Sequence, residues 1–228
     1  MLCVCLQFPA CAASMLLLIS NANCQMTGFA VATVGWILTI TSMGLVEWRL
    51  WYMDNTSIFP SSLVCVGLWK VCIYHRVGDY SGATFCYQYG YRDTYLPLDI
   101  RISQNLQLVA SVLGLLGRAS VIFALRNVYV GILQKSATFN PFVASGILNL
   151  ASGICISIAV VWNHHSVMNG EGIIFLPSVS LPLKPSTQEI GSALLVACLA
   201  AFMMVLSGLL FLSCKFPTVS RVHPETDM

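Results

Sequence analysis

Charged side chains are scarce in this sequence of 228 residues. It contains only 11 Lys and Arg and 9 Asp and Glu, 9% of all residues, whereas 57% of the residues are hydrophobic. A typical soluble domain has about 25% charged residues, so this chain cannot cover a globule with polar surface and is predicted to lie in a lipid bilayer. The net charge of +2 provides no basic stripe to neutralise a row of phosphates, which excludes nucleic acid as a partner.

Four long stretches are almost free of charge and predict four transmembrane helices. They are residues 26–46, 102–125, 141–162 and 190–213. Each exceeds roughly 20 residues, enough at a rise of about 1.5 Å per residue to cross a hydrocarbon core of about 30 Å. Only Arg118 interrupts them, and we expect it near the inner end of its helix with its head group among the lipid head groups. None of the four stretches contains a carboxylate, which argues against an ion pump or a proton-coupled carrier.

Small residues recur at four-residue spacing within these stretches and predict close helix packing. The rows are Ala110 and Gly114 in the second stretch, Gly153 and Ser157 in the third, and Ala193, Ala197 and Ala201 in the fourth.

The charges outside these stretches predict the orientation. The connection 126–140 carries Arg126 and Lys135 and no acid, and the tail 214–228 adds Lys215 and Arg221, so both are expected in the cytoplasm. Residues 47–101 and 163–189 are then the first and second extracellular loops. Both termini are then expected in the cytoplasm. Residues 1–25 form an N-terminal extension, which either stays in place or is a cleaved signal peptide lacking its usual basic region; a start at Met15 is a further alternative.

The first extracellular loop contains the stretch VGLWKVCIYHRVGDYSGATFC, residues 66–86. Its β-branched and aromatic residues predict a strand over residues 63–75 and a second over 83–91, joined by a Gly-containing turn. Cys72 and Cys86 lie at equal distances from Asp79, so they are expected to face each other across this hairpin and to form a disulfide outside the cell. Cys65 is a third cysteine in this loop, either free or paired with another chain.

A family signature is present in the same loop. Trp48, then Gly67-Leu68-Trp69, Cys72 and Cys86 resemble the signature of the claudin family, and LPLD (96–99), Trp162 and QEIGSALL (188–195) fit the same family. The resemblance implies a mainly α membrane fold, a four-transmembrane-helix bundle with a small extracellular antiparallel β-sheet formed by the two outer loops. Two features depart from the family: Cys72 and Cys86 are further apart than usual, and Gln104 stands in place of an Arg, which predicts the loss of one polar anchor.

The resemblance also implies a function. A claudin-like chain is expected in the plasma membrane at tight junctions, where it assembles with other claudin-like chains in the same and the opposing membrane, mediates cell adhesion and forms a paracellular barrier. The alternative within the wider group is an auxiliary subunit or a peripheral-myelin-type protein that modulates another membrane protein. Tetraspanins and connexins are excluded because the second outer loop contains no Cys. No enzyme activity, cofactor or metal site is expected, and His164 and His165 are interpreted as a wet helix end.

Several further sites are predicted outside the family signature. The pattern Asn55-Thr56-Ser57 is an N-glycosylation acceptor, Cys214 at the membrane edge is a palmitoylation candidate, and the C-terminal Thr226 and Met228 suit a PDZ scaffold or belong to an unstructured end. By the resemblance, a contact loop between cells is expected at Phe175, Leu176, Pro177 and Val179. The first outer loop has five bases and five acids and a neutral stretch after Cys86, which predicts a barrier or a poorly selective component.

Overall fold

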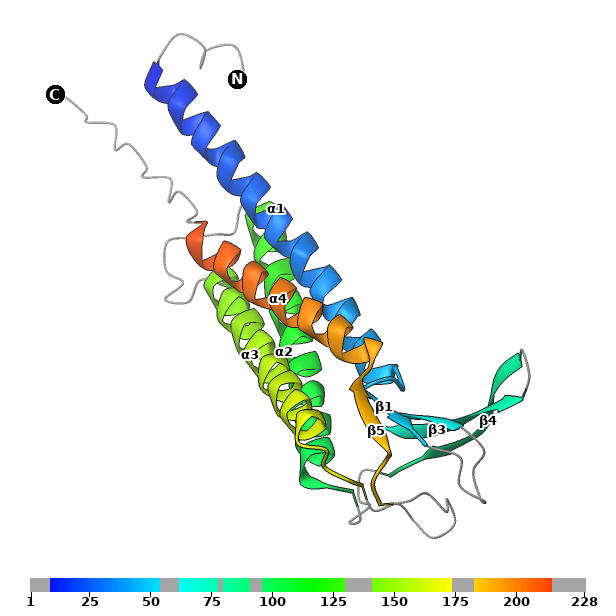
Figure 1. Cartoon of the computed structure of the whole chain (residues 1–228). Coiled ribbons are helices and arrows are strands. Elements are labelled where there is room, and N and C mark those ends of the chain that lie inside the picture. Colours follow the sequence, from blue (N-terminus) through cyan, green and yellow to red (C-terminus); the bar gives the residue numbers. More distant parts are fainter. Residues whose placement is uncertain are drawn as a thin grey trace, which may run out of the picture.

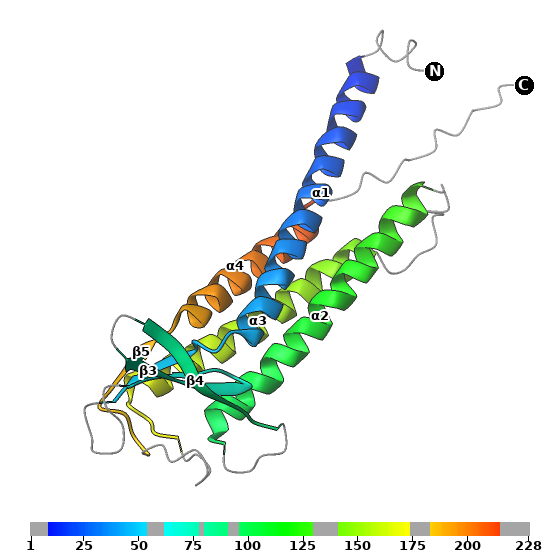
Figure 2. The same cartoon turned by 90° about the vertical axis from the view of Figure 1, so that its right-hand side faces the viewer.

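The residues that the structure describes fold into a bundle of four helices with a five-stranded sheet at one end (Figure 1). This computed structural model describes residues 9–53, 62–77, 80–90, 96–129, 141–173 and 183–214. The helices are α1 (Pro9–Gly44), α2 (Leu98–Tyr129), α3 (Pro141–Met168) and α4 (Ser192–Ser213). A view at right angles shows the sheet to one side of the lower end of α2, at the end of the bundle where α1 ends and α4 begins (Figure 2). The expected class, mainly α with a small sheet, is therefore correct.

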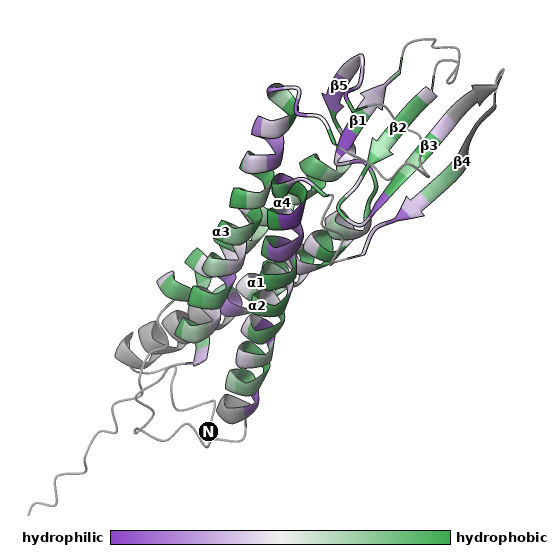
Figure 3. Ribbon diagram, turned by 90° about the horizontal axis from the view of Figure 1, so that it is seen from below, coloured by the Kyte–Doolittle hydropathy of each residue, from purple (hydrophilic) through white to green (hydrophobic). Residues whose placement is uncertain are grey.

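All four helices have the length and composition of membrane spans. The apolar parts are Asn23–Gly44, Leu98–Arg126, Pro141–Met168 and Ser192–Ser213. Large apolar side chains such as Val112, Phe123, Val161 and Phe202 point outward from them, as expected for surfaces that face lipid. Hydrophobic residues accordingly dominate the helices in Figure 3, whereas hydrophilic ones gather at the end of α3 nearest the sheet and in β1 and β5.

Small residues form the helix contacts inside the bundle. Ala110, Ala193 and Ala197 are fully buried there, together with Ile156 and Met204. A methyl group added to Gly153 would lie 2.7 Å from Cγ2 of Val205, so α3 and α4 approach closely at this glycine. Ser157 is only part-buried, and its hydroxyl donates a hydrogen bond to the Gly153 carbonyl oxygen at 2.9 Å.

Arg118 does not reach the lipid head groups, contrary to the expectation from the sequence. Its side chain is only 7% exposed and turns toward α1. There Nη1 donates a hydrogen bond to the Ala32 carbonyl oxygen at 3.0 Å, and the guanidinium lies 4.1 Å from the centre of the Trp36 ring. An aromatic face and a carbonyl oxygen thus replace water as its partners.

The sheet is antiparallel throughout and draws on both predicted outer loops. Its strands are β1 (Arg49–Tyr52), β2 (Ser62–Val66), β3 (Lys70–Val77), β4 (Tyr80–Gln88) and β5 (Thr187–Ile190), in the order β4-β3-β2-β1-β5. The single strand expected over residues 63–75 is wrong. That segment is two strands, β2 and β3, which reverse direction at Gly67, whose N–H donates to the Lys70 carbonyl oxygen at 2.9 Å.

Candidate functional site

The Gly-Leu-Trp motif joins the sheet to the helix bundle. Leu68 is fully buried and packs in the bundle core with Trp48. The Trp48 indole Nε1 donates to the Ser42 carbonyl oxygen at 2.8 Å, which fixes the ring where α1 ends and the sheet begins. A methyl group on Gly67 would lie 2.8 Å from the Val46 Cα, so only glycine fits at this crossing. The motif therefore works as a structural latch between the two parts of the fold.

Gln104 provides a polar anchor of its own at the same junction. Its Nε2 donates to the Leu68 carbonyl oxygen at 2.6 Å, and the Tyr89 hydroxyl donates to the Gly67 carbonyl oxygen at 2.6 Å. The loss of an anchor predicted from the missing Arg is therefore wrong, because the amide reaches a backbone carbonyl directly. Tyr89 belongs to the neutral stretch after Cys86, but its side chain is buried in the junction and does not contribute to the exposed surface.

A buried ion pair holds the sheet against the ends of α2 and α3. Arg49 on β1 forms a salt bridge with Asp99 in the first turn of α2, and both side chains are almost fully buried. The Arg49 Nε also donates to Asn163 Oδ1 at 3.2 Å. The Ser166 hydroxyl contacts the carboxylates of Asp99 and Glu171, each at 2.7 Å. This Arg49–Asp99 cluster connects three elements that are distant in sequence.

Three cysteines form a row across β2, β3 and β4. The register pairs Cys65 with Cys72 and Cys72 with Cys86, so their side chains share one face of the sheet. Cys72 and Cys86 form a disulfide, with a Cα–Cα distance of 4.1 Å. Near the tip of the hairpin Val77 pairs with Tyr80, and this register would not place Cys72 opposite Cys86. A one-residue shift in register between Ile73 and Tyr74 brings the two cysteines opposite each other.

Cys65 is a free and buried thiol beside this disulfide. Burial raises its pKa from 9.0 to about 11, and the Glu47 carboxylate adds to the effect. Because the thiolate is the nucleophile in disulfide exchange, Cys65 is a poor attacker of the neighbouring bond. The arrangement favours one stable disulfide with a protected third thiol.

The strand β5 fastens the second outer loop to the first. β5 pairs with β1 along its whole length, and the Tyr52 hydroxyl hydrogen-bonds the Glu189 carboxylate, which raises the Tyr52 pKa. Just beyond, Gly191 lies against the Glu47 carbonyl oxygen, where a larger residue would collide. The Glu47 carbonyl oxygen also accepts a hydrogen bond from the Ala193 N–H at 3.0 Å. The start of α4 is therefore attached to the first residue of the first outer loop.

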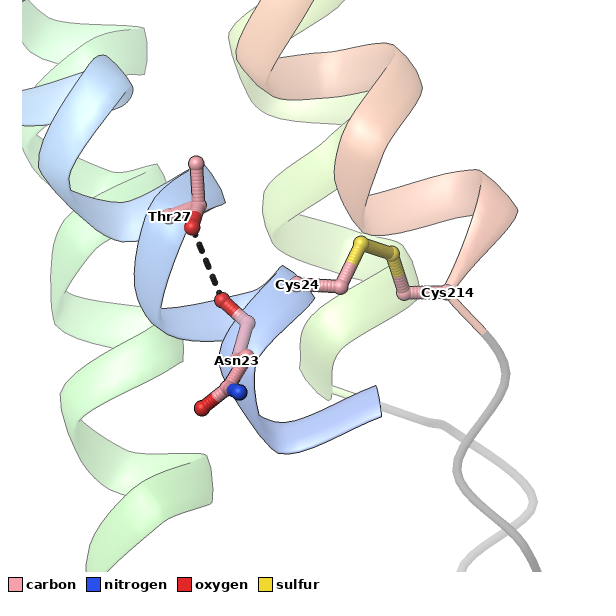
Figure 4. Close-up of a disulfide and its surroundings, with 4 residues drawn as sticks. All are labelled: Asn23, Cys24, Thr27 and Cys214. Carbon is pink, nitrogen blue, oxygen red and sulfur yellow. Dashed lines mark hydrogen bonds between the residues drawn. A yellow bond between two sulfur atoms is a disulfide. The ribbon is translucent and has the colours of Figure 1, made fainter. Parts of the chain in front are cut away.

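Sequence reasoning missed the Arg49–Asp99 cluster. Both residues counted only as balanced loop charges, although each lies next to an apolar span, which is the one signal that could have marked them for burial. Asn163 and Ser166 were likewise unnoticed. Several predicted residues lie outside the described part of the chain, namely Asn55, Phe175, Leu176, Pro177, Val179, Thr226 and Met228. Cys214 is described, as the residue that follows the last residue of α4, and it is bonded to Cys24 of α1 (Figure 4).

Comparison with known proteins agrees with this geometry. Residues 33–213 match the family described as PMP-22/EMP/MP20/Claudin tight junction. The chain belongs to the claudin family. Mouse claudin-1 is 26% identical over 90% of this chain and 92% of its own length. Rat claudin-19 is 27% identical over 90% and 86%, and claudin-4 of Chlorocebus aethiops is 25% identical over 91% and 90%.

Membership of the claudin family indicates what class of protein this site belongs to. The chain is a multi-pass membrane protein in which the Gly-Leu-Trp latch, the disulfide and the sheet built from both outer loops form one head on a four-helix bundle. Family membership points to a junction protein rather than an enzyme.

Proposed function

We propose that this claudin mediates cell adhesion at tight junctions and forms a paracellular barrier through lateral and head-to-head assembly. The supporting observation is the construction of the head: strands from both outer loops share one sheet, and Trp48 and Leu68 lock that sheet into the bundle core. A fixed head lets contacts between neighbouring chains add up along a strand, because no ordering of loops opposes each contact. The claudin relatives support the same function at the family level.

Freeze-fracture imaging tests this proposal. Cells that lack other claudins should form continuous strands at their contacts when they express the full chain, and transepithelial resistance should rise. A variant with Cys72→Ser and Cys86→Ser should form few strands, since the hairpin loses its cross-link, whereas Cys198→Ser on the outer surface of α4 is the matched control. Surface delivery without any strands would contradict the proposal.

A second candidate function is modulation of another membrane protein. It is favoured by the breadth of the matched family, whose description includes PMP-22, EMP and MP20 besides claudins. Absence of strands, together with stable co-purification of a channel or receptor from membranes, would support this auxiliary role over the junction role.

We further propose an orientation with both termini in the cytoplasm and the sheet outside, with the span bounds expected from the sequence. Basic residues between α2 and α3 and after α4 support it. Asn55 is then accessible to glycosylation. A glycosidase should increase the gel mobility of the chain, and Asn55→Gln should remove the shift. An epitope at the C-terminus that stains without permeabilisation would contradict the orientation.

The cell contact is proposed to involve the apolar residues Phe175, Leu176, Pro177 and Val179 in the second outer loop. Replacing Phe175 and Leu176 with Ser should reduce enrichment at contacts between two expressing cells and leave lateral assembly in single cells intact. Equal enrichment of the variant and the native chain would exclude this loop from the contact.

The tail is proposed to bind PDZ scaffolds through Thr226, Met228 and the terminal carboxylate. Amidating or extending Met228 in a tail peptide should abolish capture of PDZ domains.

Cys214 is proposed as a palmitoylation site, because its thiol lies at the end of a membrane-spanning helix. Acyl exchange on the native chain should label a cysteine that the Cys214→Ser variant lacks.

A further inference from the structure

Cys24 and Cys214 are brought together at the end of the bundle farthest from the sheet. Their side chains point toward each other from α1 and from the end of α4, and their sulfur atoms are bonded (Figure 4). The Cα–Cα distance of 6.3 Å lies within the range of roughly 4.4–6.8 Å that disulfides use. The two residues are 190 positions apart in sequence, so only the fold makes them neighbours.

Packing one turn further into the bundle holds this pair in place. The Ser207 hydroxyl donates to the Gly28 carbonyl oxygen at 2.9 Å, and a methyl group on Gly28 would already touch the Phe211 ring at 3.4 Å. Gly28 follows Cys24 by four residues, and Phe211 precedes Cys214 by three, so these contacts lie on the same helix faces as the cysteines. The cysteines therefore extend a contact between α1 and α4 that exists without them.

The location determines how such a pair behaves. In the proposed orientation this end of the bundle faces the cytosol, where glutathione keeps thiols reduced and disulfides are transient or redox-sensing. Cys24 and Cys214 are both half-buried, so small reagents can reach them. The sheet disulfide between Cys72 and Cys86 lies at the other end, in an oxidising environment. The two bonds thus belong to different redox compartments.

We propose that Cys24 and Cys214 form a reversible dithiol site that reacts with low-molecular-weight disulfides of the glutathione type. One cysteine thiolate attacks a sulfur of the small disulfide and releases one small thiolate. The second cysteine thiolate then attacks the protein sulfur of this mixed disulfide and releases the other. Two electrons pass from the cysteines to the small disulfide, and the two protons lost by the cysteines are taken up by the two small thiolates.

The bond has a direct consequence for the tail. In the oxidised state the first residue of the tail is tied to α1, and the Cys214 sulfur is unable to carry a thioester. Palmitoylation of Cys214 and the disulfide therefore exclude each other. The inference rests on the proposed orientation, but it does not depend on strand formation.

The test uses the full chain with a protease site inserted between α2 and α3, purified in detergent. Samples are equilibrated in glutathione buffers from reduced to oxidised, free thiols are blocked, and the cut protein is run on a non-reducing gel. The cut separates Cys24 from Cys214 but keeps Cys72 and Cys86 in one fragment. We expect the joined fraction to rise at least tenfold from the reduced to the oxidised buffer.

Variants identify the bond. Cys24→Ser and Cys214→Ser should each give separate fragments at every glutathione ratio, whereas Cys155→Ser and Cys198→Ser, both within the spans, should behave like the native chain. Fragments of the native chain that separate at every ratio would overturn the proposal. So would joined fragments that persist in Cys24→Ser, because another pair would then be responsible.

Labelling in intact cells tests the compartment separately. A membrane-permeant maleimide should modify Cys24, and an impermeant one should not. Labelling by the impermeant reagent would overturn the cytosolic role and the orientation together, whereas missing strands in freeze-fracture images would leave this site untouched and refute only the junction function.

Discussion

At the residue scale, the Arg49–Asp99 cluster is the most consequential feature. Two opposite charges are removed from water between β1 and α2, and Asn163 and Ser166 each hydrogen-bond one member of the pair. A buried pair is expensive to form, but leaving one member alone is worse, because an uncompensated charge then stays buried. The cluster therefore makes the contact between the sheet and the bundle sensitive to the loss of either charge.

The first prediction concerns this pair. Asp99→Asn should destabilise the protein by about 3–5 kcal/mol, because the Arg49 charge loses its counter-ion. Arg49→Met should have a similar cost, while the double variant should be less destabilised than the two single effects combined. Thermal unfolding of the purified chain measures all three. Lys70→Met, an exposed cation on the same sheet, is the control, and simple additivity would refute the coupling.

The second prediction concerns Cys65. With a pKa of about 11 instead of 9.0, the Cys65 thiolate fraction at pH 8 should be about 100-fold below that of an ordinary thiol. Alkylation should accelerate about tenfold for each pH unit up to the pKa, because only the thiolate reacts. Mass spectrometry of Cys65 peptides measures the rate. In denaturant Cys65 should react as an ordinary thiol, and fast labelling of the folded chain at pH 8 would contradict its burial.

At the scale of elements, the reversal between β2 and β3 depends on one glycine. Gly67 passes so close to the end of α1 that an added methyl group would meet the Val46 Cα at 2.8 Å and the Leu45 carbonyl oxygen at 2.9 Å. Backbone atoms on both sides leave no flexible side chain to yield. The latch thus needs glycine for close approach, not for an unusual backbone angle.

The third prediction follows from this contact. Gly67→Ala should destabilise the chain by about 1–3 kcal/mol, the usual cost of overpacking, and should reduce delivery to the cell surface. Gly44→Ala is the matched control, because nothing lies within 4 Å of a methyl group at that position. Surface biotinylation and thermal unfolding measure the two variants side by side. Equal behaviour of both would show that the junction adapts to the added methyl group.

The helices and the disulfide pair were predictable from the sequence, whereas the junction was not. Charge-free runs reveal spans directly, since a bilayer demands them. The strand break at Gly67 was hidden, because the β-forming run from Leu63 to His75 continues through it and the turn depends on contact with α1. Arg49 and Asp99 are 50 residues apart, so their pairing follows only from the assembled fold. Arg118 likewise found its partners on another helix.

At the scale of the whole molecule, the head presents little net charge. Arg49 and Asp99 neutralise each other inside the protein. After Cys86 the chain offers Tyr87, which packs against the sheet core, exposed Gln88, and buried Tyr89. Among the strand side chains that the structure describes, Lys70 and Glu189 are exposed charges of opposite sign. Such a surface gives no uniform field along a paracellular pore.

The last prediction is that this claudin forms a barrier or a weakly selective pore. Epithelial monolayers that express it should show increased resistance and a sodium-to-chloride permeability ratio close to that of the parent cells, because opposite charges on the head cancel within about a Debye length of 8 Å. Dilution potentials measure this ratio. Lys70→Glu makes the exposed charges at positions 70 and 189 both negative and should shift the ratio toward sodium, whereas Glu189→Lys should shift it toward chloride. Two further charges of the first outer loop, Arg92 and Asp93, lie outside the described part of the chain. A large selectivity in the native protein that is reversed by changing the sign at either one would show that a local charge, and not the balance of the head, governs the pore.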